Sequence, residues 1–186
     1  CLAALQRAQE EGLIGAIGCS SHAPLPLLLT IIATRAFAFV NLHYNFFRQE
    51  NRAAIDLADA LGMGVFIISP NEKGGLLYHP SATLARLTQP LHPVHFNERW
   101  LLAQPQVHTL SVGPSLPEHL EIHLKSLESL PYRDTDERRI EAELNQYLAR
   151  SPLDRCGPCR QCLPCPVKID IPTVLRLKHL RETLEM

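Results

Sequence analysis

The sequence has no long apolar run, no excess of one charge and no short repeat of fixed period. Its longest apolar stretches, around Leu25–Ile32 and Val65–Ile68, are too short and too interrupted to cross a bilayer. Its 18 basic and 19 acidic side chains give a formal net charge of −1, which argues against a general nucleic-acid-binding surface. These absences favour a soluble globular protein, with no membrane and no nucleic acid among its partners.

An initiator methionine and a signal peptide are also lacking. The chain begins with Cys1, so we expect a fragment, a processed form or an incomplete reading frame. Without a secretory signal, its six cysteines indicate a reducing compartment, and we predict a cytoplasmic protein.

Four of the cysteines are crowded near the end of the chain, in Cys156-Gly-Pro-Cys159-Arg-Gln-Cys162-Leu-Pro-Cys165-Pro166. Each two-residue interval lets the backbone turn and direct the next sulfur inward, so four thiolates can surround one compact inorganic core. The pattern is one residue shorter, in its last interval, than the C-x2-C-x2-C-x3-C-P run of bacterial ferredoxins. We therefore predict that Cys156, Cys159, Cys162 and Cys165 bind a [4Fe-4S] cluster.

Three alternatives fit the cysteine run less well. Structural zinc sites usually join two CxxC pairs through a loop of a dozen or more residues. Disulfides need separations that such crowded cysteines satisfy poorly, and a thioredoxin-like CxxC would follow a strand and open a helix. Within the cluster hypothesis, the fourth ligand stays open, because Cys1 or Cys19 could compete with Cys165.

Apolar runs alternate with helical patterns along the chain. The runs predict four buried strands of a parallel sheet, at Ile14–Cys19, Phe37–Leu42, Gly64–Ser69 and Thr109–Val112. Helices are predicted at Leu2–Gly12, Leu27–Thr34, Asn51–Leu61, Phe96–Ala103, Pro117–Leu127, Asp136–Ala149 and Ile171–Glu185. A closed (β/α)8 barrel needs about 250 residues. We therefore predict an α/β fold: residues 1–130 form about the last four βα units of a TIM barrel, and residues 131–186 form an α-helical iron–sulfur appendage.

Polar residues and glycines follow each predicted strand, where barrels place their ligands. They are Ser20, Ser21 and His22, then Asn41 and His43, then Ser69 and Lys73, and finally Gly113 and Ser115. After the third strand, Ser69-Pro-Asn71-Glu-Lys73-Gly74-Gly75 has the glycines and the positive charge of a phosphate-binding loop. Serine caps and ordinary turns remain the alternative interpretation for each segment taken alone.

The same segments resemble, in order, the C-terminal half of the aldo/keto reductase family. The resemblance rests on Gly18-Cys-Ser20-Ser21, Val40-Asn41-Leu-His-Tyr44-Asn45, Ile68-Ser69-Pro70 with Gly74-Gly75-Leu-Leu, and Val112-Gly113-Pro-Ser115. The cysteine run followed by Asp170-Ile171-Pro172 is similar to the tail of the iron–sulfur subgroup of that family.

The resemblance implies an NAD(P)-dependent oxidoreductase acting on a small carbonyl or alcohol. It maps the nicotinamide carboxamide onto Ser20, Ser21 and Asn41, although the family more often has Asn and Gln there. It maps the pyrophosphate onto Ser69, Asn71, Lys73, Gly74 and Gly75. The adenosine phosphate maps onto Gly113 and Ser115, and no basic residue decides between NAD and NADP.

No residue of this chain matches the catalytic Asp, Tyr, Lys and His of the family, which lie on its first four strands. Tyr44 belongs to a different strand and is not the family's tyrosine acid. We therefore predict no catalytic residue and expect activity only from a longer protein. Two alternatives are a non-catalytic iron–sulfur module that serves an electron-transfer partner, and an inactive truncated product.

Overall fold

A computed structural model describes residues 2–128, 134–150 and 161–184. The chain divides into two compact units. The first unit comprises residues 1–70 and 104–112, and the second comprises residues 71–103 and 113–186. The predicted boundary between residues 130 and 131 lies inside the second unit, among residues that the structure does not describe, so it stays a prediction.

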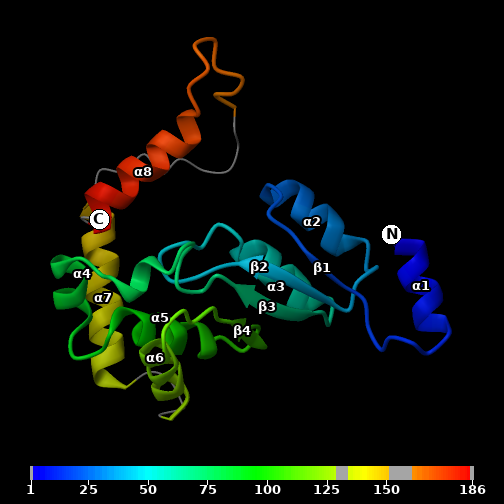
Figure 1. The fold of residues 1–186 in the computed structure, drawn as a ribbon, viewed down its shortest axis with the longest axis horizontal. Coiled ribbons are helices and arrows are strands. Elements are labelled where there is room, and N and C mark those ends of the chain that lie inside the picture. The colour runs from blue at the N-terminus through cyan, green and yellow to red at the C-terminus, as the bar shows by residue number, and fades with distance from the viewer. Residues whose placement is uncertain (1, 129–133, 151–160, 185–186) are drawn as a thin grey trace. The chain divides into compact units, whose positions relative to one another are not determined.

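The first unit contains a four-stranded parallel sheet (Figure 1). Its strands are β1 (Gly18–Ser20), β2 (Phe39–His43), β3 (Gly64–Ile68) and β4 (Thr109–Ser111), and they pair in that order. Its helices are α1 (Leu2–Glu10), α2 (Leu25–Ala33) and α3 (Arg52–Ala60). The α/β class and the parallel sheet are therefore confirmed, and each predicted strand exists with shifted ends.

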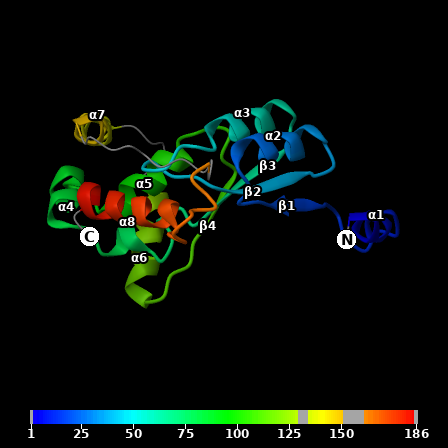
Figure 2. The same cartoon turned by 90° about the horizontal axis from the view of Figure 1, so that it is seen from above.

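The two faces of this sheet differ in burial. Val40 and Leu42 of β2, and Val65 and Ile67 of β3, are fully buried. Helix α3 packs against β3, and α2 lies beside α3 (Figure 2). On the opposite face Phe39 and Phe66 are half-buried, and their rings stack with centroids 4.8 Å apart.

The second unit is built from helices. They are α4 (Ala82–Thr88), α5 (Pro93–Leu102), α6 (Pro117–Glu128), α7 (Thr135–Arg150) and α8 (Ile171–Leu184), with a short 3-10 helix, η1 (Leu76–Tyr78). Helix α5 packs against α4, α6 and η1, and its Val94, Phe96 and Leu101 are fully buried. It is therefore the central element of the unit.

Helix α7 is fixed to α5 by polar contacts. Arg99 of α5 forms a buried ion pair with Glu137 of α7, and the indole N–H of Trp100 donates to Glu141 over 3.3 Å. Glu137 also closes the start of α7, because its carboxylate accepts from the Asp134 amide (3.0 Å) while its own amide donates to Asp134 (2.9 Å). Two side chains thus satisfy the free N–H groups of the first turn.

In the second unit, sequence analysis missed helix α4 and placed the start of α5 too late. The segment from Pro80 to Pro93 showed only proline punctuation, yet it contains α4, whose start is capped by Ser81 Oγ accepting from the Leu84 amide (3.1 Å). Helix α5 starts three residues before the predicted Phe96, because Pro93 occupies its first turn, where proline is tolerated. Within the described residues, no helix is both long and apolar enough to span a membrane.

Candidate functional site

The first unit brings together the residues predicted at the ends of β1 and β2. Ser20 lies directly opposite Asn41 in the parallel register, and the Ser21 amide donates to the Asn41 carbonyl over 3.2 Å. Ser21 Oγ accepts from the Ala23 amide (3.1 Å), so this hydroxyl also serves a local turn. The carboxyl ends of parallel strands lie at the same edge of the sheet. This brings Ser20 and Ser21 next to Asn41, although they are distant in sequence.

Asn41 carries a buried acceptor that the protein leaves unused. Its Oδ1 atom is buried and has no hydrogen-bond partner among the described residues. Buried polar atoms are nearly always paired, so such an atom suits a ligand that brings an N–H group. A carboxamide has that chemistry, which makes Asn41 compatible with the predicted contact to nicotinamide.

Ser69 ends β3 and lies in the same unit. Its backbone is left-handed (φ +49°), a conformation that a strand cannot continue, so β3 stops at Ile68 rather than at the predicted Ser69. Tyr44, at the end of β2, is fully buried, and burial raises the pKa of its phenol, while hydrogen bonding to Arg52 opposes that rise.

The part of the glycine-rich loop from Asn71 to Gly75 belongs to the second unit and has three left-handed residues. Glu72, Gly74 and Gly75 are all left-handed (φ +63°, +79° and +69°), and Lys73 is exposed. A Cβ added to Gly75 would lie 2.7 Å from the Tyr78 ring, whereas one added to Gly74 would meet nothing within 4 Å. Gly75 is therefore needed for its conformation and for close packing, and Gly74 for its conformation alone.

The side chain of Asn71 points into the protein instead of toward the loop. It is buried, its Nδ2 donates to Glu98 Oε1 over 2.8 Å, and its Oδ1 accepts from Asn97 over 3.5 Å. Only the Asn71 backbone is left for the predicted phosphate contact. The side chain anchors the first residue of the loop to α5.

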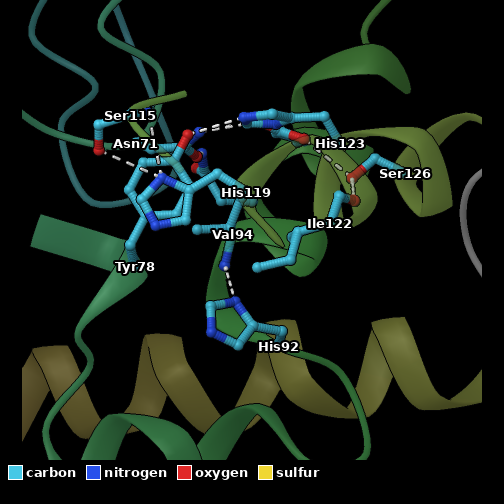
Figure 3. A network of polar contacts seen from close by, with 11 residues as sticks. Asn71, Tyr78, His92, Val94, Ser115, His119, Ile122, His123 and Ser126 are labelled. Carbon is cyan, nitrogen blue, oxygen red and sulfur yellow. Dashed lines mark hydrogen bonds and ion pairs between the residues drawn. The ribbon is translucent and has the colours of Figure 1, made fainter. Parts of the chain in front are cut away.

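Glu98 of α5 is the centre of a buried polar network. Figure 3 shows three other members of this network, Asn71, His123 and Ser126. Glu98 is only 2% exposed, and three groups surround its carboxylate. Asn71 Nδ2 and His123 Nδ1 lie 2.8 and 2.7 Å from Oε1, and Ser126 Oγ lies 2.9 Å from Oε2. A buried charge is tolerated when it is hydrogen-bonded in this way.

The network continues from His123 to the start of α6 (Figure 3). His123 Nε2 lies 2.7 Å from the Tyr78 hydroxyl, and the Tyr78 ring stacks on His119 with centroids 3.9 Å apart and an angle of 8°. His119 Nδ1 in turn accepts from the Ser115 amide over 3.3 Å. The second unit thus links the predicted pyrophosphate loop to the residues predicted for the adenosine phosphate.

The position of Ser115 changes one detail of the prediction. Its amide donates to His119 and is therefore not free for a phosphate, and the exposed Ser115 hydroxyl lies 3.4 Å from the same ring nitrogen. Gly113 is exposed, and a Cβ built on it would meet nothing within 4 Å. Open space for a ligand therefore exists beside Gly113, and Ser115 would contribute its hydroxyl.

Sequence analysis missed Glu98, His119, His123 and Tyr78. The only signal was the helical spacing of the polar residues His119, His123 and Ser126, which places them on one face of α6. An ordinary amphipathic helix buries its apolar face, whereas α6 buries these three. The leucines of α6, each more than half exposed, form another stripe: Leu120, Leu124 and Leu127.

The cysteine motif is described only in its second half. Cys156 and Cys159 lie outside the described residues. Cys162 is exposed, Cys165 is half-buried, and neither forms a disulfide within the described chain. No three metal-binding side chains of the described residues are grouped to hold an ion. With two of its four ligands outside the description, the cluster stays a prediction. Burial raises the pKa of Cys19, which disfavours its thiolate as a competing ligand.

Solved aldo-keto reductases have a similar fold. The holo form of AKR11C1 from Bacillus halodurans gives a TM-score of 0.60 at 18% identity, covering 76% of this chain and 54% of that one. The thermostable aldo-keto reductase Tm1743, in complex with the inhibitor epalrestat, gives 0.59 at 20% identity, covering 76% and 53%. Aldose reductase from Giardia lamblia gives 0.59 at 20% identity, covering 77% and 50%.

This chain spans about half the length of the structures it matches. No protein-family model and no curated protein matches the sequence. At such low identity the likeness concerns the fold. It confirms the predicted fold class: the parallel sheet and its helices are part of a (β/α)8 barrel.

Proposed function

We propose that this chain is the nucleotide-binding part of an NAD(P)-dependent oxidoreductase of the aldo/keto reductase type. The proposal depends most on one observation. In a single unit, a left-handed loop with an exposed lysine is tied, through Tyr78 and His119, to the exposed Ser115 at the start of α6. Two segments that the family resemblance maps onto phosphates are thereby connected.

Each residue of the loop would make a different contribution to phosphate binding. Lys73 supplies a positive charge at the surface, and Gly74 is exposed and left-handed. The Gly75 amide donates to the Glu72 carbonyl over 3.0 Å, so an anion would have to be met by the other amides of the loop. The Ser115 hydroxyl can donate to a second phosphate. In the first unit, the unused Asn41 Oδ1 suits a carboxamide, and Ser20 lies opposite it.

A bound nicotinamide would supply hydride transfer to or from a small carbonyl or alcohol. We assign no catalytic residue in this chain, because none of its residues matches the catalytic Asp, Tyr, Lys and His that the family has on its first four strands. The remaining catalytic groups would belong to chain outside this sequence. We propose that the protein is cytoplasmic and that this chain by itself binds the nucleotide without catalysing hydride transfer.

A titration with NADPH, NADH and ADP-ribose tests the nucleotide proposal. Replacing Lys73 by Ala should weaken binding about tenfold, since the variant loses one hydrogen bond to a charged group. Lys125→Ala, which removes an exposed lysine from α6, is the matched control and should bind like the wild type. The proposal would be contradicted if none of the three ligands bound, or if the two variants lost the same amount of affinity.

The second part of the proposal is a [4Fe-4S] cluster bound by Cys156, Cys159, Cys162 and Cys165. The described half fits it, because Cys162 and Cys165 are not consumed by a disulfide and Cys162 is exposed. An iron–sulfur module serving an electron-transfer partner is the second candidate function, and it rests on this motif. Anaerobic purification should give about four irons and four sulfides per chain, whereas one zinc ion would exclude the cluster.

A further inference from the structure

The parallel sheet of the first unit has two open edges. Among the described residues, β1 pairs only with β2, and β4 pairs only with β3. An open edge presents unpaired N–H and C=O groups to which a strand of another chain can add. Proteins shield such edges, and a barrel removes them altogether by closing on itself.

Backbone hydrogen bonds show which residues of β4 face its open edge. The His108 amide, just before β4, donates to the Val65 carbonyl of β3 over 3.0 Å. Successive residues of a strand direct their backbone groups to opposite sides, so every second residue after His108 also faces β3. Thr109 and Ser111 therefore direct their N–H and C=O groups to the open side.

The same reasoning applies to β1 at the other end of the sheet. The Ile17 carbonyl accepts from the Ala38 amide, just before β2, over 2.8 Å, and the Ser21 amide donates to β2 over 3.2 Å. The residues between them alternate, so Gly18 and Ser20 direct their backbone groups to the open side. Each edge strand therefore offers two residues for pairing.

The sheet face that bears Phe39 and Phe66, here named the inner face, is packed like the interior of a barrel. Phe39 lies in register between Gly18 and Gly64. A Cβ added to Gly18 would overlap the Phe39 ring, and one added to Gly64 would lie 3.1 Å from the Phe39 Cβ. A large side chain between glycines of the neighbouring strands matches the layers of barrels, which alternate strands fill. Both aromatic rings remain only half-buried.

We propose that two copies of this chain close one eight-stranded barrel, in which β1 of each copy pairs with β4 of the other. Four strands are half of the eight in a (β/α)8 barrel, and the chain spans about half the length of the structures it matches. A two-fold axis along the barrel keeps all eight strands parallel. It also repeats one contact at both junctions, and β1 and β4 have equal lengths of three residues.

A second copy fits this surface better than a peptide or a helix does. A single added strand would fill one edge and leave the other open, and a helix packed on the inner face would pair with neither edge. A second copy fills both edges and covers Phe39 and Phe66 at the same time. The inner face includes Asn41, two residues after Phe39, so each copy would help to exclude water from that side chain. The inference goes beyond nucleotide binding and does not depend on it.

Sedimentation equilibrium over a series of protein concentrations tests the association. We expect a closed dimer, with twice the chain mass of 20.9 kDa. A monomer at every concentration would overturn the proposal and would leave both edges to chain outside this sequence. Oligomers that keep growing with concentration would also overturn it, because a barrel of eight strands is complete with two copies.

Two substitutions target the proposed contact, and each has a matched control. Ser111→Pro removes an amide from the open side of β4, where proline is tolerated, and leaves the pairing with β3 in place. Because the contact occurs twice, the dissociation constant should rise about tenfold or more. Ser111→Ala keeps the amide and should dimerise like the wild type.

Phe66→Glu places a charge on the inner face and should give a monomer, which circular dichroism should show to be folded. Its control is Leu124→Glu, which places the same charge on the exposed leucine stripe of α6. That variant should stay dimeric. If Leu124→Glu were monomeric while Ser111→Pro and Phe66→Glu stayed dimeric, the interface would lie on α6 and the proposal would be wrong.

Hydrogen exchange gives a second measurement that does not depend on a variant. The amides of Thr109 and Ser111 should exchange more slowly as rising protein concentration fills the dimer. Exchange that stays fast in a dimeric sample would overturn the strand pairing. A titration with ADP-ribose, performed on the Phe66→Glu monomer and on the wild type, measures nucleotide binding separately, so either proposal can fail while the other stands.

Discussion

Replacing Glu98 should destabilise the second unit by an amount that depends on what replaces it. Glu98→Gln keeps the shape and one oxygen, which can still accept from Asn71 and His123. Ser126 can turn its hydroxyl to the Ile122 carbonyl, 3.1 Å away, and accept from the new amide. The two remaining hydrogen bonds then have a neutral acceptor in place of a charged one. The loss is about 1–4 kcal/mol in total, given that bonds to charged groups contribute about 1.5–3 kcal/mol and neutral ones about 1.

Glu98→Leu should cost more, because it leaves two buried donors without an acceptor. Asn71 Nδ2 and His123 Nδ1 would each lose a partner, and each unsatisfied buried group costs about 1–3 kcal/mol. Since Ser126 has its alternative acceptor, we expect a total of about 2–6 kcal/mol. The leucine is therefore predicted to be worse than the glutamine, although it is the more apolar residue.

Urea unfolding followed by circular dichroism gives both free energies, and Glu121→Gln on the exposed side of α6 is the control. That variant should change stability by less than about 0.5 kcal/mol. Equal stability of Glu98→Leu and the wild type would refute the hydrogen-bond assignment, because it would mean that Asn71 and His123 do not depend on Glu98. A double-mutant cycle of Glu98→Gln with His123→Asn should show coupling, since the two side chains touch.

Two further predictions concern the same unit. Burial lowers the pKa of His92 and His95, and in the folded state these rings resist protonation. Their contribution to stability is thus complete above the unfolded pKa of about 6.5 and is lost as the pH falls below it. The urea midpoint of His95→Asn should therefore change less between pH 7 and pH 5 than that of the wild type. An equal change in the two proteins would contradict this prediction. Gly75→Ala should cost more than Gly74→Ala, because both are left-handed but only the first would clash with Tyr78. We expect about 1 kcal/mol for Gly74 and about 1–3 more for Gly75, and equal thermal shifts would show that the Tyr78 ring moves freely.

The strands and their order could be predicted because both depend on local pattern. Val40, Leu42, Val65 and Ile67 lie in short apolar runs between helical segments, and such runs are typical of parallel strands covered by helices. Once the strands are parallel, their ends share one edge. The meeting of Ser20 with Asn41 follows from that geometry and is confirmed.

The helix starts that were predicted wrongly are those that depend on capping residues. Ser81 and Pro93 start helices in a segment whose prolines suggested only a loop. Asp134 and Glu137 close the start of α7, one residue before the predicted helix begins. Caps use short side chains that also occur in turns, so their effect depends on the backbone that follows.

The sequence by itself determined the parallel βα units, the glycine-rich turn after β3 and the spacing of the four cysteines, because these depend on residues close together in the chain. Only the tertiary structure decided which face of α6 is buried. Helical periodicity defines a leucine face and a histidine face, but it does not say which one a neighbour will satisfy. Glu98, on another helix, provides the buried acceptor that makes His123 and Ser126 the inner face.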